Sequence, residues 1–287
     1  MNKIAPFLAV AGIVALHIGL IFALSPYSVS MFGLPAIAVC IGLAFVIQWA
    51  AFVPAYLTGS ERFFDLMGSI TYLSVSAVAL ASKDMLDARS LIIAACVSIW
   101  AVRLGSFLAR RIHADGKDGR FDTIKNNFGV FLMTWTLQGM WVSLCYAAGL
   151  AAMTSAVVVA PDAFLYVGLL LWLLGFVVEV IADQQKSAFR ANAENVGKFI
   201  TTGLWSRSRH PNYFGEITLW LGVTVMALPV LQGWQYVALI SPVFTWLLLT
   251  KISGVRMLEA RGRKRWGEDP EYQAYMDNTP RLVPRVF

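Results

Sequence analysis

The run IAPFLAVAGIVALHIGLIFAL, residues 4–24, contains no charged side chain. A helix needs about 20 predominantly apolar residues to cross the hydrocarbon core of a bilayer, so this run is long enough to span one. Seven further apolar runs follow, at residues 33–57, 63–82, 90–110, 129–152, 162–182, 214–230 and 233–251. We therefore expect an all-α, polytopic membrane bundle of about eight transmembrane helices, because only helices and closed barrels satisfy every backbone group in lipid.

The composition agrees with this class and narrows the partners. Of the 287 residues, 58% are hydrophobic and 14% are charged, whereas a soluble domain carries roughly 25% charged residues. The net charge of +6 comes from basic residues in the connections, which is typical of orientation signals and not of a nucleic-acid site. Cys40, Cys96 and Cys145 fall inside apolar runs without metal-ligand spacing. We expect no metal, no disulfide and no nucleic-acid partner.

The connections between the runs divide by charge. Those at 110–127 and 183–213, and the tail after Lys251, are rich in Lys and Arg, whereas those at 25–32, 153–161 and 231–232 have none. The connection at 83–89 holds Lys83 and Arg89, offset by Asp84 and Asp87. Because basic loops stay in the cytoplasm, we expect both termini there. The first run then reads as a membrane helix and not as a removed signal.

Ionisable side chains inside the runs are costly in lipid and therefore indicate a partner or a function. Asp65, Arg103, Glu179 and Asp183 all fall toward the predicted cytoplasmic ends of their helices. Any one of them alone could reach the interface by snorkelling, but four at one depth favour a shared polar cavity. Tyr72 lies seven residues after Asp65 and shares its helix face, although this spacing alone equally fits a packing aromatic.

The stretch TGLWSRSRHPNYFGE, residues 202–216, is the most informative in the chain. Its two arginines, histidine and asparagine stand just before a membrane helix, and guanidinium groups and helix N-termini hold phosphate oxygens. Glu179, Asp183 and Arg190 recur on one helix face if the preceding helix continues beyond the membrane. The alternative is a basic loop that only fixes orientation, but such a loop has no need of Asn, His, Tyr and Trp.

At these residues the chain resembles the carboxy-terminal region of the steroid 5α-reductase family, and in particular an uncharacterised bacterial branch. The likeness is carried by Asp183, Arg190, Gly203-Leu204-Trp205, Asn212-Tyr213-Phe214-Gly215-Glu216, and the end at Tyr275 and Leu282-Val283-Pro284. Upstream, residues 61–69 and 100–105 look like the same branch. The resemblance covers most of the chain. It implies one membrane domain, with substrate-side helices in 1–160 and a cofactor-binding region in 161–287.

The resemblance implies a membrane-embedded reductase that takes NADPH from the cytoplasm and transfers hydride to a C=C bond. The substrate would be an apolar, steroid-like or isoprenoid-like molecule arriving from the lipids of a bacterial inner membrane. The expected cofactor residues are Arg103, Glu179, Asp183, Arg190, Trp205, Arg209, His210, Asn212, Tyr213 and Glu216. Asp65 falls where the family has a catalytic glutamate, but Trp100 falls where it has a tyrosine, so Tyr72 is the expected replacement.

The alternative is an S-adenosylmethionine-dependent methyltransferase of the isoprenylcysteine or phospholipid type. Those families also carry an Arg-His-Pro-x-Tyr-x-Gly stretch before a membrane helix, as residues 209–215 do here. Their tails typically hold adjacent glutamates, whereas this tail has Glu259 alone in Met-Leu-Glu-Ala. The carboxylates Glu179 and Asp183 fit the reductases better. A non-enzymatic scaffold is a third reading, and it gives no reason for the ionisable cluster.

Overall fold

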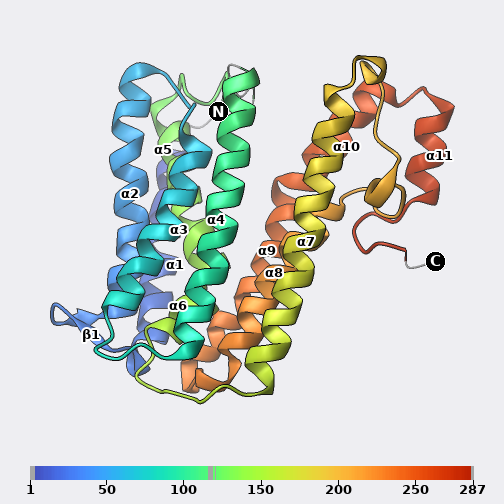
Figure 1. Cartoon of the computed structure of the whole chain (residues 1–287). Helices are drawn as coiled ribbons and strands as arrows, with labels where there is room; N and C mark the ends of the chain where they lie inside the picture. Colours follow the sequence, from blue (N-terminus) through green and yellow to red (C-terminus); the bar gives the residue numbers. More distant parts are fainter. Residues whose placement is uncertain (1–3, 116–118, 120, 286–287) are drawn as a thin grey trace. The chain divides into compact units, whose positions relative to one another are not determined.

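The computed structural model describes residues 4–115, 119 and 121–285, and their backbone is almost entirely helical (Figure 1). The chain divides into two compact units. Unit 1 comprises Met1–Leu165 and Met226–Ile240, and unit 2 comprises Tyr166–Val225 and Ser241–Phe287. Both units are built from apolar helices, which confirms the all-α membrane class.

Unit 1 contains α1 (Ala5–Leu24), α2 (Ala36–Thr58), α3 (Phe64–Ala81), α4 (Ala88–Asp115), α5 (Phe128–Cys145) and α6 (Ala147–Met153). A hairpin of two short strands, β1 (Ser30–Met31) and β2 (Leu34–Pro35), joins α1 to α2. Its turn places Gly33 at a φ of 78°, a conformation that glycine adopts without strain. Residues 226–240 add the 3₁₀ helices η4 (Leu228–Val230) and η5 (Gly233–Leu239).

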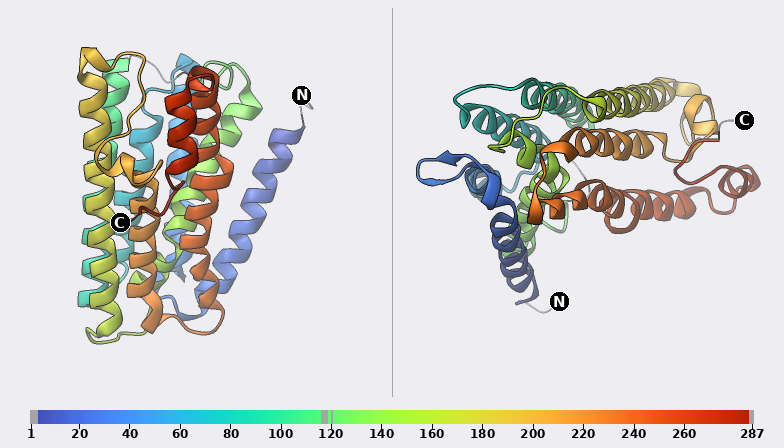
Figure 2. Two further views of the ribbon diagram at one scale, coloured as in Figure 1. Left: turned by 90° about the vertical axis from the view of Figure 1, so that its right-hand side faces the viewer. Right: turned by 90° about the horizontal axis from the view of Figure 1, so that it is seen from below.

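Unit 2 contains α7 (Ala163–Ala191, whose first residues belong to unit 1), α8 (Pro211–Ala227), α9 (Ile240–Leu247), α10 (Gly254–Trp266) and α11 (Pro270–Asn278). A π turn, η6 (Leu248–Ile252), joins α9 to α10, and short 3₁₀ helices, η2 (Ala193–Asn195) and η3 (Gly203–Ser206), lie between α7 and α8. In Figure 2, α10 and α11 stand at the end of unit 2 where α7 finishes.

Eight helical segments of the described residues are long and apolar enough to cross a membrane, as the sequence predicts. Two details differ from the expectation. The fifth span breaks at Tyr146 between α5 and α6, and the eighth begins as a 3₁₀ helix and runs through η6 into α10. The sixth agrees well, because α7 continues to Ala191 and so carries the polar face of Glu179, Asp183 and Arg190 beyond the apolar run.

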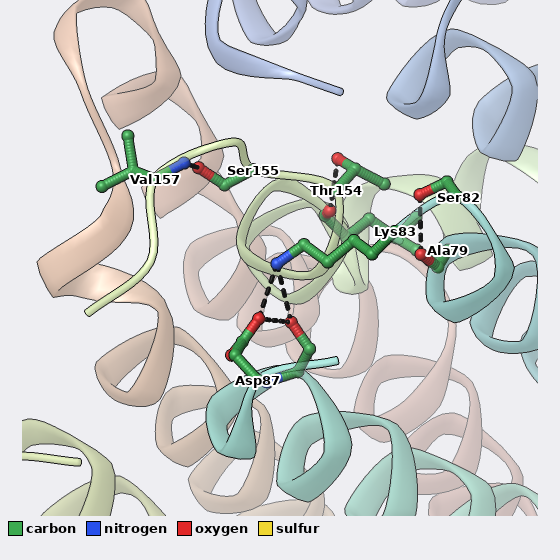
Figure 3. Close-up of polar contacts among 9 residues, drawn as sticks. Ala79, Ser82, Lys83, Asp87, Thr154, Ser155 and Val157 are labelled. Atoms are coloured by element: carbon green, nitrogen blue, oxygen red, sulfur yellow. Dashed lines mark hydrogen bonds and ion pairs between the residues drawn. The ribbon is translucent and has the colours of Figure 1, made fainter. Parts of the chain in front are cut away.

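The connection from α3 to α4 shows how unit 1 neutralises its two basic residues there. Lys83 donates to Asp87 at 2.6 Å and to Ser90 at 3.1 Å (Figure 3). Burial alone would raise the pKa of Asp87, but the hydrogen bonds from Lys83 and Ser90 hold it below the usual value. Arg89 is buried and pairs with Asp162 at 3.0 Å. Asp87 therefore offsets the charge of Lys83, as expected, and Asp162 offsets the charge of Arg89.

In unit 2, α7 and α8 pack at backbone distance along a glycine seam. A Cβ atom added to Gly215 would lie 2.5 Å from the Gly175 carbonyl oxygen and 2.7 Å from the Glu179 nitrogen. About two turns further on, a Cβ atom added to Gly222 would lie 2.6 Å from the Gly168 carbonyl oxygen. Small residues allow helices to approach this closely in membranes. The seam fixes the polar end of α7 against the start of α8.

Candidate functional site: a basic, aromatic pocket in unit 2

Unit 2 contains a pocket of about 330 Å³ whose lining combines positive charge with flat rings. Its basic residues are Lys186, Arg190, Lys198, Arg209, Arg261 and Arg265. Its aromatic residues are Phe189, Phe199, Trp205, Trp266, Tyr272 and Tyr275, and His210 and Glu259 are the remaining ionisable groups. Guanidinium and ammonium groups bind phosphate oxygens, and aromatic rings stack on planar groups. The pocket therefore suits an anionic ligand that carries a ring.

Four segments supply the lining residues of this pocket: the end of α7, the connection 192–210, α10 and α11. The face of α10 toward the pocket holds Leu258, Glu259, Arg261, Gly262, Arg265 and Trp266, which recur at helical spacing. Arg263 and Lys264, on the same helix, are exposed and are not among the lining residues. Part of the basic charge of α10 thus faces the pocket.

Trp205 ties the pocket walls together. Its indole Nε1 donates to the Ala182 carbonyl on α7 at 3.0 Å, and its own carbonyl accepts from the Tyr275 hydroxyl on α11 at 2.8 Å. The Lys186 ammonium lies 4.4 Å from the centroid of its ring, within cation–π range. Because these partners lie far apart in sequence, Trp205 is a structural link as well as a lining residue.

The segment before α8 is held by the end of the described chain. The Arg209 amide donates to the Pro280 carbonyl at 2.9 Å, and the Ser208 hydroxyl donates to the Leu282 carbonyl at 2.7 Å. Residues 280–282, which include the first residue of the Leu-Val-Pro end, therefore anchor the segment just before α8.

Glu259 gathers three cationic or imidazole partners at one side of the pocket. Its carboxylate lies 3.3 Å from Arg209, 3.3 Å from His210 and 3.3 Å from Arg281. These are looser than the roughly 2.7–2.9 Å of the strongest charge-assisted hydrogen bonds. The Nε atom of Arg209 is buried and has no acceptor within the described residues.

His210 is 5% exposed and stacks on Tyr213, with ring centroids 5.7 Å apart. Burial lowers the pKa of His210 and outweighs the opposing effect of Glu259, so the imidazole is neutral at pH 7. Its Nε2 then donates to Glu259, and its Nδ1 is a buried acceptor with no partner in residues 4–115, 119 and 121–285. Such a buried polar atom, in a residue that lines a pocket, fits a site that receives a ligand.

Four of the ten predicted cofactor residues belong to the pocket lining. Arg190, Trp205, Arg209 and His210 line the pocket. Nearby in unit 2, the Asn212 amide donates to Asp183 at 3.2 Å. Glu179 and Glu216 are buried where α7 meets α8.

The remaining predicted residues, Asp65, Tyr72 and Arg103, belong to unit 1. Asp65 pairs with Arg111 at 3.6 Å, and Tyr72 is buried with its ring edge-on to Trp100 at 5.1 Å.

Sequence reasoning did not place α10 and α11 at the pocket. Arg261, Arg265, Trp266 and Tyr272 of these helices line it, and so does Tyr275, which belongs to the likeness but was given no role. Lys186 on α7 and Lys198 in the connection after it were also not among the predicted residues. The spacing of Leu258, Arg261, Arg265 and Trp266 on one face of a helix was a usable signal. It was overlooked because basic residues after a membrane helix are also expected where they only fix the orientation of the protein in the membrane.

Comparison with known proteins matches residues 51–279 to a family described as protein of unknown function (DUF1295). The chain belongs to the DUF1295 family. The matched region includes every residue that lines the pocket. Among the described residues of this DUF1295 protein, no group of three or more His, Cys, Asp or Glu side chains could hold a metal ion.

Two curated relatives are similar to parts of this DUF1295 protein. An uncharacterized protein of Schizosaccharomyces pombe is 29% identical over 144 residues, which covers 42% of the chain and 39% of the relative. A probable O-methyltransferase of Ustilaginoidea virens is 32% identical over 77 residues, which covers 27% of each protein. The chain therefore spans well under half the length of both relatives. No solved structure matches it.

Proposed function

We propose that this DUF1295 protein is a membrane reductase that binds NADPH in the pocket of unit 2 and reduces a C=C bond of an apolar substrate. The family includes steroid 5α-reductase-like proteins. The observation that carries the proposal is the pocket lining, in which six basic side chains and six aromatic rings accompany one carboxylate. In this proposal the protein lies in a bacterial inner membrane and the pocket faces the cytoplasm, since the basic connections of the chain follow the positive-inside rule.

The charge of the lining favours a dinucleotide over S-adenosylmethionine. A phosphorylated dinucleotide carries a diphosphate and a further phosphate, whose oxygens match Arg190, Arg261 and Arg265. S-adenosylmethionine carries a sulfonium cation, which a basic pocket repels. The aromatic rings of Trp266 and Tyr272 offer surfaces for a base or a nicotinamide.

The polar groups of the pocket and its surroundings fit such a ligand. The buried Nε of Arg209 is a donor for a phosphate oxygen, and the buried Nδ1 of His210 is an acceptor for a hydroxyl or amide. Asn212 and Asp183 form a hydrogen-bonded pair that can read a carboxamide or ribose. When bound, the reduced cofactor would supply the hydride.

The substrate end of the proposal rests on unit 1. Tyr72 would donate a hydrogen bond to a substrate carbonyl and so polarise the conjugated C=C bond. Asp65, which pairs with Arg111 at 3.6 Å, lies seven residues earlier on α3, about 10 Å away along the helix. In this proposal Asp65 supports Tyr72 in polarising the carbonyl.

A methyltransferase is the second candidate. It is favoured by the relative named as a probable O-methyltransferase and by the Arg-His-Pro-x-Tyr-x-Gly stretch at 209–215. That relative matches only 27% of the chain, and the pocket charge described above weighs against a cationic cofactor. The reductase is therefore the better-supported proposal.

Thermal unfolding of the purified protein in a neutral detergent separates the two candidates. NADPH should raise the midpoint, since a ligand that binds only the folded state adds about 2.7 kcal/mol at 100 times its Kd. Arg265→Gln should weaken this shift, whereas Arg263→Gln on the same helix should leave it unchanged because Arg263 does not line the pocket. Stabilisation by S-adenosylmethionine and none by NADPH would sink the reductase proposal.

A further inference from the structure

Glu259 is the one carboxylate among the pocket-lining residues that the structure describes. It lies where an anionic ligand would be attracted, and its side chain is only 10% exposed. A fixed negative charge in this pocket repels an anionic ligand and so weakens its binding. The proposed function gives Glu259 no role, so its position needs a separate explanation.

The contacts of Glu259 resemble those of a bound phosphate. Two guanidinium groups, of Arg209 and Arg281, and the imidazole of His210 converge on its two oxygens. Arginine holds phosphate and carboxylate with the same planar fork. Each of the three contacts is long, at 3.3 Å, so the carboxylate fills this cluster without bonding it tightly.

Arg209 also has unused capacity. Its Nη1 contacts Glu259 and the Met276 sulfur, while its Nε is buried with no acceptor among the residues that the structure describes. Burying an N–H group without a hydrogen-bond partner is unfavourable. An incoming phosphate, with several acceptor oxygens, would satisfy the Nε and Nη groups together, which a single carboxylate oxygen does not do here.

We infer that Arg209, Arg281 and His210 form a phosphate subsite that Glu259 fills as an internal counter-ion until a ligand phosphate takes over these partners. The inference rests on the proposed function for the identity of the ligand as a nucleotide. Glu259 lowers the affinity of the empty pocket for stray anions, and Arg209 and Arg281 stay ordered between ligands. Removing its charge should therefore tighten phosphate binding and not abolish it.

The test compares the whole protein with Glu259→Gln in zwitterionic lipid nanodiscs, by calorimetric titration with 2′,5′-ADP and with inorganic pyrophosphate. We expect binding to become about five- to tenfold tighter in Glu259→Gln, as the repulsion of a nearby, partly screened charge is removed. The matched control is Glu271→Gln, which removes the same charge from an exposed position on α11 outside the lining and should not change the affinity.

The outcomes separate this inference from the proposed function. If the natural protein binds 2′,5′-ADP but Glu259→Gln binds it equally or more weakly, the counter-ion role is wrong and the nucleotide site stands. If neither binds 2′,5′-ADP but both bind pyrophosphate, with the variant tighter, the subsite stands and the nucleotide proposal fails. Binding of neither probe overturns both.

A second variant tests the same inference if Glu259→Gln does not fold. Arg281 is 43% exposed in its side chain, so Arg281→Gln should fold normally. It should weaken pyrophosphate binding several-fold if Arg281 transfers to the ligand. Unchanged binding in Arg281→Gln would show that this arginine pairs with Glu259 alone. It would overturn the inference that Arg281 transfers from Glu259 to the ligand phosphate.

Discussion

Replacing Gly215 by alanine tests the glycine seam between α7 and α8. The added methyl group would lie 2.5 Å from the Gly175 carbonyl oxygen, 2.7 Å from the Glu179 nitrogen and 3.0 Å from the Glu179 Cα. Ordinary contacts at a Cβ atom are 3.4 Å or more. All three obstructing atoms belong to the backbone of α7, so no side chain can rotate away. The two helices must separate or tilt.

The expected cost follows from two opposing effects. Overpacking in a close-packed interior typically costs about 1–3 kcal/mol. Alanine has a higher helix propensity than glycine by up to about 1 kcal/mol, which offsets part of this cost. Because the obstruction is backbone against backbone, we expect the upper part of the range to apply, with a net loss of about 1–2 kcal/mol in the free energy of unfolding. Gly222→Ala should behave in the same way.

Thermal unfolding in detergent, followed by circular dichroism, measures the effect, which corresponds to a fall of roughly 2–4 °C per kcal/mol. Gly12→Ala and Gly19→Ala are matched controls, because both glycines are helical and nothing lies within 4 Å of an added Cβ atom. These controls should be neutral or slightly stabilised. If Gly215→Ala is as stable as Gly12→Ala, α7 and α8 do not approach as described.

Three other side chains supply independent tests. Arg89→Met should destabilise the protein by about 1–3 kcal/mol, because the Met226 carbonyl loses its buried donor; a melting temperature equal to that of the natural protein would contradict this role. His210 has a lowered pKa in the folded state, so the unfolded chain binds its proton first. Its contribution to stability is complete above pH 6.5 and is lost as the pH falls below that value. His210→Gln should flatten this part of the stability–pH profile, and an unaltered slope would assign it to another group. Tyr72→Phe should keep the fold but slow enone reduction about 100-fold, and unchanged turnover would remove Tyr72 from the proposed chemistry.

The membrane helices could be predicted from sequence because their signal is local. An apolar run of sufficient length has no stable alternative in lipid to a helix. The break at Tyr146 could not be predicted, because its cause is tertiary. The Tyr146 hydroxyl lies 3.0 Å from Ser76 on α3 and donates to the Met153 sulfur, and these partners are known only once the helices pack.

The candidate site could be predicted in part for a similar reason. Arg209 and His210 stand out because polar residues just before a membrane helix are unusual. Tyr275 belongs to the family likeness, but its place in the pocket could not be predicted, since its contact with Trp205 spans 70 residues of chain. The exposed helix α11 has the composition of an ordinary soluble segment, and only the fold turns one face of it toward the pocket.

The wall that α11 contributes has a consequence for biosynthesis. Residues 270–285 leave the ribosome after the eight candidate membrane helices of the described residues, yet they supply Tyr272 and Tyr275 to the pocket and hold Arg209 through Pro280. Those eight helices can therefore insert into the bilayer while the pocket still lacks a wall. Under the proposed function, a chain stopped at residue 269 should insert normally but fail to bind the nucleotide.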